Sequence, residues 1–128
     1  MRLTRHRFTV LGLLIAIALV GLCVSVLSTG VQVTVTNLGP DPSSDAVVHV
    51  TGNAHPIGRL DVGASRTVRV RPRGESHVEI GFTDPQGKRS RLVVDCYFET
   101  NHYRGAIAVE IESGAIRRVD DRVRSSLY

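Results

Sequence analysis

Alternating valines constrain the fold of this chain more than any other feature. After residue 28, β-branched and aromatic residues recur at every second position in short runs, with polar residues between them. A period of two puts the apolar side chains of a run on one face of a β-strand, so one face is buried and the other is in water. The runs predict strands around residues 31–35, 47–50, 57–60, 68–70, 78–82, 92–98, 107–111 and 116–119.

Turn-forming residues separate these runs. Two prolines within residues 37–42 cannot supply the backbone donors of a sheet, and Gly or Pro also occurs within 61–63, 72–74, 84–87 and 113–114. We find no long run with a helical period after residue 28. Seven or eight short strands at roughly ten-residue intervals predict an all-β fold. We expect an antiparallel β-sandwich over residues 29–119 and a flexible tail over 120–128.

The N-terminal part of the chain is apolar without alternation. Residues 8–28 carry no charge, and Arg2, Arg5 and Arg7 precede them. A helix of that length measures roughly 31 Å, enough to cross the hydrocarbon core of a bilayer. We therefore expect a cytoplasmic basic segment at 1–7 and one transmembrane signal-anchor helix at 8–28. This arrangement would place residues 29–128 outside the cytoplasm. The alternative is a cleaved signal peptide and a secreted domain.

The net charge of +4 looks at first like a sign of nucleic-acid binding. However, three of the 16 Lys and Arg residues precede residue 8, whereas all 12 acidic residues follow residue 28. The excess of positive charge therefore belongs mostly to the N-terminal segment, and we expect no nucleic-acid partner. One local group remains as a candidate anion-facing row, with a solvated strand face as the simpler alternative: Arg66, Arg69, Arg71 and Arg73.

A family resemblance covers residues 31–71. The residues that carry it are Val33-x-Val35-x-Asn37-x-Gly39, Val48-x-Val50 and Leu60-x-x-Gly63-x-Ser65-x-x-Val68-x-Val70. This pattern resembles bacterial immunoglobulin-like domains of the cell-adhesion-related kind. The resemblance implies an immunoglobulin-like, extracytoplasmic sandwich that spaces or binds other proteins, and it implies no catalytic residues.

A second, shorter resemblance lies at the N-terminus. The run from Arg7 to Ile15 is similar to the start of type IV pilin-like proteins. It lacks two features of that start, because Arg7 stands in place of the processing glycine and Gly12 in place of the assembly glutamate.

The chemistry-bearing residues do not form a recognisable catalytic or metal motif. Cys96 shares its parity with Leu92, Val94 and Phe98, which predicts a buried thiol; the alternative is a nucleophile served by His102. His49, His55, His77 and His102 show no close pair of the kind that binds zinc. We therefore expect no enzyme activity, no metal and no cofactor.

The segment 97–105 is the best candidate for an interaction patch. It concentrates two of the three tyrosines with an arginine and a histidine, residue types that are enriched in interface hot spots. The alternative is an ordinary hairpin loop capped by tyrosine packing. The candidate residues are Tyr97, Glu99, His102, Tyr103 and Arg104.

These observations predict a class of function but no specific activity. We expect a membrane-anchored module that acts by contact with another envelope protein or as part of envelope structure. The alternative is an envelope domain that binds a small ligand or a metal ion.

Overall fold

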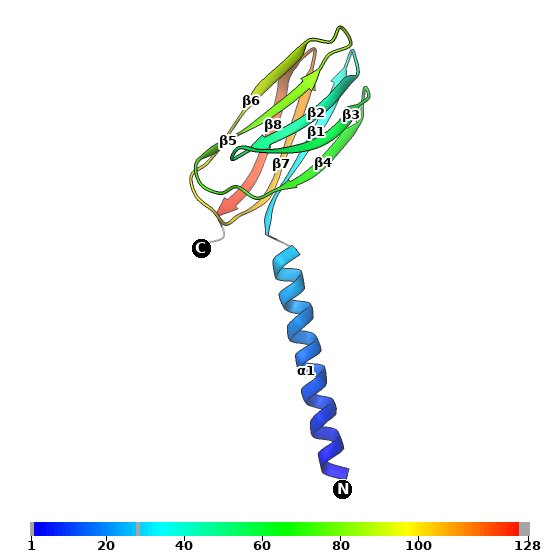
Figure 1. Ribbon diagram of the computed structural model, residues 1–128, viewed down its shortest axis with the longest axis vertical. Coiled ribbons are helices and arrows are strands. Elements are labelled where there is room, and N and C mark those ends of the chain that lie inside the picture. Colours follow the sequence, from blue (N-terminus) through cyan, green and yellow to red (C-terminus); the bar gives the residue numbers. More distant parts are fainter. Residues whose placement is uncertain (1, 28, 126–128) are drawn as a thin grey trace.

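The chain forms one helix followed by eight strands in two facing sheets (Figure 1). The computed structural model describes the backbone of residues 2–27 and 29–125, and side chains of residues 9–24 and 29–125. The elements are α1 (Arg2–Leu27), β1 (Gly30–Gly39), β2 (Ser43–Val50), β3 (Asn53–Leu60), β4 (Ser65–Val70), β5 (Ser76–Thr83), β6 (Arg89–Phe98), β7 (Tyr103–Glu112) and β8 (Ala115–Ser125).

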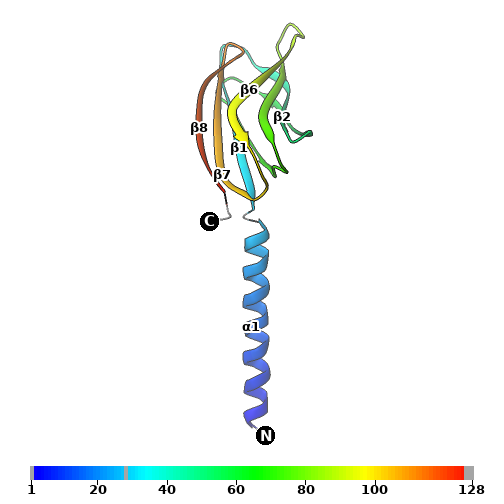
Figure 2. The same ribbon diagram turned by 90° about the vertical axis from the view of Figure 1, so that its left-hand side faces the viewer.

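All eight predicted strands are present, and they make a β-sandwich. One sheet has the order β4-β1-β7-β8 and the other β3-β2-β5-β6. Figure 2 shows the two layers facing each other. The sheets contact each other at their edges, β3 against β4 and β6 against β8. The alternating valines and their apolar neighbours fill the space between the sheets. The largest fully enclosed side chains are Phe98, Leu60, Ile80, Ile107, Val31, Val33, Val35, Val48, Val70, Val78, Val94 and Val109.

The sandwich is not purely antiparallel, which corrects the expectation. β1 pairs with β7 in parallel, with Val33 opposite Ile107 and Val35 opposite Val109. Both strands begin at the end of the sandwich where α1 joins it, and they are neighbours in one sheet, so they run in the same direction (Figure 1). The period-two pattern could not reveal this, because it reports that one face of a strand is buried and the other wet, whichever way the neighbour runs.

The expected transmembrane helix is also corrected. Within the described part of the chain, α1 included, no helix is both long and apolar enough to cross a membrane. The outward placement of residues 29–128, with secretion as its alternative, stays a prediction.

The last strand extends beyond the expected end of the sandwich. β8 continues through Asp120 to Ser125, and its pairing with β7 ends at Tyr103 opposite Ser125. The sheet therefore includes most of the segment for which we expected a flexible tail; residues 126–128 lie outside the described part. The valines at positions 119 and 123 pack against the core and keep the outer strand in register.

Candidate functional site

The segment predicted as an interaction patch connects the two sheets rather than forming a hairpin. β6 belongs to one sheet and β7 to the other, so residues 99–102 cross from layer to layer at the helix end of the sandwich. The crossing separates the predicted residues. Tyr97 lies on the outer side of β6, 46% exposed, with its ring centroid 4.7 Å from that of His77. His102 and Arg104 lie at the end of the sandwich instead, where they line a cleft.

Tyr103 has a structural role at the start of β7. Its ring packs on buried Phe98 with centroids 4.9 Å apart, and its hydroxyl accepts a hydrogen bond from the backbone N–H of Glu99 at 3.2 Å. The tyrosine thereby ties the start of β7 to the end of β6. This agrees with the alternative of a loop capped by tyrosine packing, although the loop joins two layers.

The predicted arginine row divides in the same way. On β4, Arg69 lies on the outer side and pairs with Gln32, whereas Arg66 pairs with Val35 and has the parity of buried Val70. Arg71 and Arg73 follow β4 in the connection to β5, and they flank the buried Pro72. The four arginines therefore do not form one row, because the step from position 66 to 69 is odd.

The structure brings the two predicted groups together at one place. A cleft of about 400 Å³ at the helix end is lined by residues from the starts of β1 and β7 and from the connections that follow β4 and β6. We call it the basic cleft and define it by four of its lining residues, Arg71, Arg73, His102 and Arg104. The order β4-β1-β7 explains it, because the end of β4 and the start of β7 lie on either side of Gly30.

The histidines are dispersed over the sandwich. His49 and His77 lie on the outer side of the sheet β3-β2-β5-β6, His55 faces a hollow beside Arg69, and His102 is at the basic cleft. Among the described residues, no group of three or more His, Cys, Asp or Glu side chains could hold a metal ion. The metal-binding alternative therefore has no ligand set in the described part of the chain.

Cys96 is a buried core thiol, as its parity predicted. Its side chain is 7% exposed between β6 and β8. Burial, together with the nearby Asp121 carboxylate that accepts a hydrogen bond from the thiol, raises the pKa of Cys96 to about 12. The thiolate is the nucleophilic form of cysteine, so this environment keeps Cys96 unreactive near neutral pH.

We expect Cys96 to resist alkylation in the folded chain. A pKa near 12 instead of the ordinary 9.0 lowers the thiolate fraction at pH 8 by roughly a thousandfold. Iodoacetamide labelling at pH 8, followed by peptide mass spectrometry, should modify Cys96 only after denaturation. Cys23 is exposed on α1 and serves as the internal control that reacts in both states. Rapid modification of Cys96 under native conditions would contradict its burial.

The outer face of the sheet β3-β2-β5-β6 carries features that the sequence analysis missed. Val93 on β6 is 58% exposed, and Glu79 on β5 forms an ion pair with Arg91 on β6. Gly81 has no side chain to cover His49, and a hollow of about 320 Å³ opens there beside Arg91. The sequence signal for an exposed apolar side chain was the adjacent pair Val93-Val94. This pair breaks the alternation, and one of two consecutive valines in a strand must face outward.

His49 lines this hollow, and the pKa of its imidazole is lowered. Burial lowers the pKa of the His49 imidazole, and the neighbouring Arg91 guanidinium lowers it further. The neutral ring is therefore the form that the folded chain favours near neutral pH, and it can both donate and accept a hydrogen bond.

Comparison with protein-family models, with curated proteins and with solved structures finds no match. The fold and the surface features place this chain in the class of mixed β-sandwiches, and its sandwich carries two distinct surfaces. These are the outer face of the sheet β3-β2-β5-β6 and the basic cleft at the helix end.

Proposed function

We propose that this chain is a non-catalytic protein-binding module and that it contacts its partner through the outer face of β5 and β6. We call this surface the β6 face and define it by His77, Glu79, Arg91, Val93 and Tyr97. The observation that carries the proposal is the exposure of Val93 and Tyr97, 58% and 46%, on the outer side of β6, the edge strand of its sheet. The other large apolar side chains exposed on the described sandwich lie at its far end, Leu38 near the end of β1 and Val62 in the turn between β3 and β4.

The composition of the β6 face supports contact with another protein. Tyrosine and arginine are enriched in interface hot spots, and an apolar centre with a polar rim is the usual organisation of an interface. Here Val93 lies opposite Glu79, and Tyr97 lies opposite His77, so apolar and charged groups alternate over two strands. The ring contact with His77 limits the freedom of the Tyr97 side chain before binding, which reduces the entropy that binding must overcome.

The outer face of the other sheet provides the contrast. There short hydroxyl side chains bond to one another across β1 and β4, Thr34 to Thr67 at 2.7 Å and Thr36 to Ser65 at 2.6 Å. Ala106 and Ala108 continue this surface on β7. Small side chains whose polar groups are already satisfied offer few anchors to a partner. We therefore assign protein contact to the β6 face.

Site-specific photocrosslinking in cells tests this proposal. A photoreactive amino acid at position 93 or 97 should give the same discrete adduct, whereas one at position 34 should give none. The exchange Val93→Lys, which places a lysine opposite Glu79, should abolish the adduct formed from position 97. It should change the free energy of unfolding by no more than about 0.5 kcal/mol, because the side chain is exposed. Equal adducts from positions 34 and 97 would contradict the assignment.

A further inference from the structure

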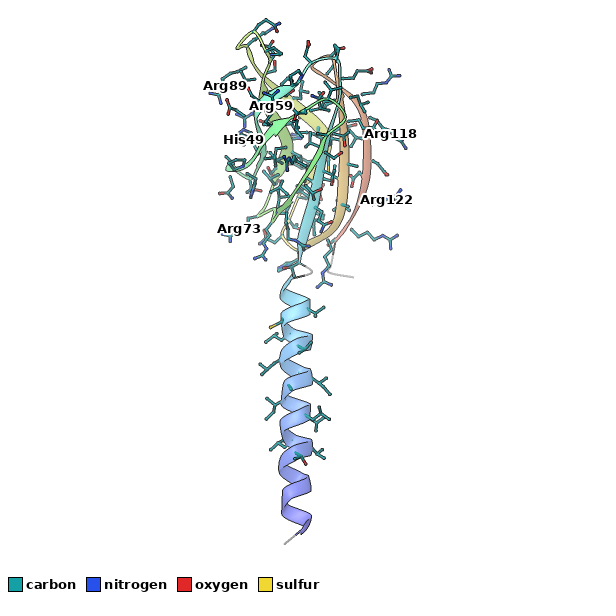
Figure 3. All side chains as sticks on the ribbon, turned by 90° about the vertical axis from the view of Figure 1, so that its right-hand side faces the viewer. His49, Arg59, Arg73, Arg89, Arg118 and Arg122 are labelled. Atoms are coloured by element: carbon teal, nitrogen blue, oxygen red, sulfur yellow. The ribbon has the colours of Figure 1, made fainter. Side chains whose placement is uncertain are left out.

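The basic cleft gathers three arginines and a histidine from segments that are far apart in the sequence. Arg71 and Arg73 come from the connection after β4, and His102 and Arg104 from the segment where β7 begins. Figure 3 shows Arg73 at the helix end of the sandwich, away from Arg89 and Arg118. A second hollow of about 410 Å³, lined by Asn53, His55 and Arg69, shares Arg71 and Arg73 with the cleft. Arg71 and Arg73 therefore line both the basic cleft and this second hollow.

No carboxylate among the described residues lines either hollow. The ion pairs of the described part of the chain engage other arginines, at positions 59, 91, 117 and 122. The acidic residues of the same two connections, Glu75 and Glu99, are near the Tyr97 hydroxyl. Glu75 accepts a hydrogen bond from that hydroxyl. Acidic groups are thus gathered on the side of the β6 face, and the cleft keeps an excess of positive charge.

Like charges also meet along the strands at this end. Arg104 lies directly opposite Arg124 in the pairing of β7 with β8. Like charges opposite each other destabilise a sheet, and an anion placed between neighbouring guanidinium groups would remove that repulsion. The planar guanidinium fork matches the oxygens of a phosphate group with two parallel hydrogen bonds.

The backbone around the cleft is held in place. The N–H of Arg73 donates to the Thr51 hydroxyl at 3.2 Å, and the N–H of Thr51 donates to the Ser76 hydroxyl at 2.6 Å. Gly30, with a φ of 101°, lets β1 begin close against the Arg69 and Arg71 stems, where an added Cβ would meet the Val70 carbonyl oxygen at 2.8 Å. A binding site needs such support, because it fixes the guanidinium groups before the ligand arrives.

We propose that the basic cleft binds a phosphomonoester-type dianion, with Arg71, Arg73 and Arg104 as the groups that contact its oxygens. The cleft volume lies in the range of small-ligand sites. The same chemistry is presented by free inorganic phosphate and by the headgroup of phosphatidic acid, so the two sources need separate measurements. This site is independent of the β6 face and of the protein contact proposed there.

Calorimetric titration of the full chain with inorganic phosphate at low ionic strength provides the first test. Wild type should bind saturably, and binding should weaken as salt is added. Arg104→Gln should weaken binding about tenfold and Arg71→Gln/Arg73→Gln at least tenfold, because each loses charge-assisted hydrogen bonds. Arg71→Lys/Arg73→Lys, which keeps the charge but loses the fork, should fall between wild type and the glutamine pair. Circular dichroism melts check that each variant folds.

The matched control is Arg89→Gln/Arg118→Gln, which removes the same charge at sites distant from the cleft (Figure 3). It should bind phosphate as wild type does. Co-sedimentation with phosphatidylcholine vesicles, with or without phosphatidic acid, then separates the two sources. Preference for phosphatidic acid that disappears in Arg71→Gln/Arg73→Gln identifies the headgroup, and saturable phosphate binding without that preference identifies the free anion. The proposal is overturned if wild type shows neither saturable phosphate binding nor a preference for phosphatidic acid. It is also overturned if the control variant weakens phosphate binding as much as the cleft variants do.

Discussion

Truncation of Phe98 to alanine should lower the free energy of unfolding by about 3–5 kcal/mol. Phe98 is 1% exposed at the end of β6 and is the largest of the fully enclosed side chains. Its ring packs on Tyr103, so the exchange opens a cavity under the connection that carries the sandwich from one sheet to the other. A domain of ordinary stability has only about 5–15 kcal/mol in total, so the exchange removes a large fraction of it.

Urea unfolding of the full chain, followed by far-ultraviolet circular dichroism, measures this effect. Val93→Ala is the matched control on the same strand, because Val93 faces outward and its truncation should cost no more than about 0.5 kcal/mol. Tyr103→Phe separates the ring from the hydroxyl, since it keeps the packing and removes only the bond from the Glu99 N–H, worth about 1 kcal/mol. A loss below about 1 kcal/mol for Phe98→Ala would show that this ring is not enclosed.

The position of Phe98 was predictable from the sequence, and so was most of the core. Residues 92, 94, 96 and 98 share one parity, and in the structure Val94, Cys96 and Phe98 are buried while Leu92 packs against the core. Alternation is a reliable signal here because each sheet has one buried and one wet face. Where a strand departs from alternation, as at Val93, the same logic would have identified an exposed apolar side chain.

The basic cleft was only half predictable. The sequence showed two groups, one of arginines around position 70 and one of mixed residues around position 102, but it gave no reason to join them. They meet because β1 lies between β4 and β7, a neighbour relation set by tertiary packing and not by local pattern. The parallel pairing of β1 with β7 was missed for the same reason, and it brings Arg104 opposite Gly30, across β1 from the end of β4.

For the helix, the sequence led to a prediction that was wrong. An uncharged stretch of sufficient length predicted a transmembrane helix, yet no helix in the described part of the chain meets the combined demand for length and apolarity. The prediction rested on the length of that stretch, on its lack of charge and on the arginines that precede it.

Asn37 is the only buried polar residue among the described residues, and its amide joins three segments at the far end of the sandwich. The side-chain NH₂ donates to the carbonyl of Asp41 at 2.8 Å and to the carbonyl of Leu60 at 3.0 Å. Its Oδ1 accepts from the N–H of Gly39 at 2.9 Å. The backbone of Asn37 also bonds to Gly63 and Ala64 in the turn between β3 and β4. One side chain thus holds the end of β1, the proline loop and the end of β3.

We expect Asn37→Leu to lower the free energy of unfolding by about 3–5 kcal/mol. Leucine has the same branched arrangement of four side-chain heavy atoms but no polar group, so three backbone groups are left without partners, each costing about 1–3 kcal/mol when buried. Asn37→Asp tests the direction of the bonds. Its carboxylate can still accept from the Gly39 N–H, but it faces two carbonyl oxygens with no proton to donate. That variant should therefore be as unstable as the leucine variant at neutral pH, and it should recover part of its stability when acid protonates the carboxylate.

Chemical denaturation of both variants, each at neutral and at acidic pH, distinguishes hydrogen bonding from packing as the role of Asn37. Thr34→Val is the control on the same strand. It removes an exposed hydroxyl that bonds to Thr67 on β4, and it should cost no more than about 0.5 kcal/mol. If Asn37→Leu keeps wild-type stability, then the backbone bonds to Gly63 and Ala64 are sufficient to join the turn to β1. If Asn37→Asp is as stable as wild type at neutral pH, the two carbonyl groups must find other donors, and the amide is not what holds this end of the sandwich together.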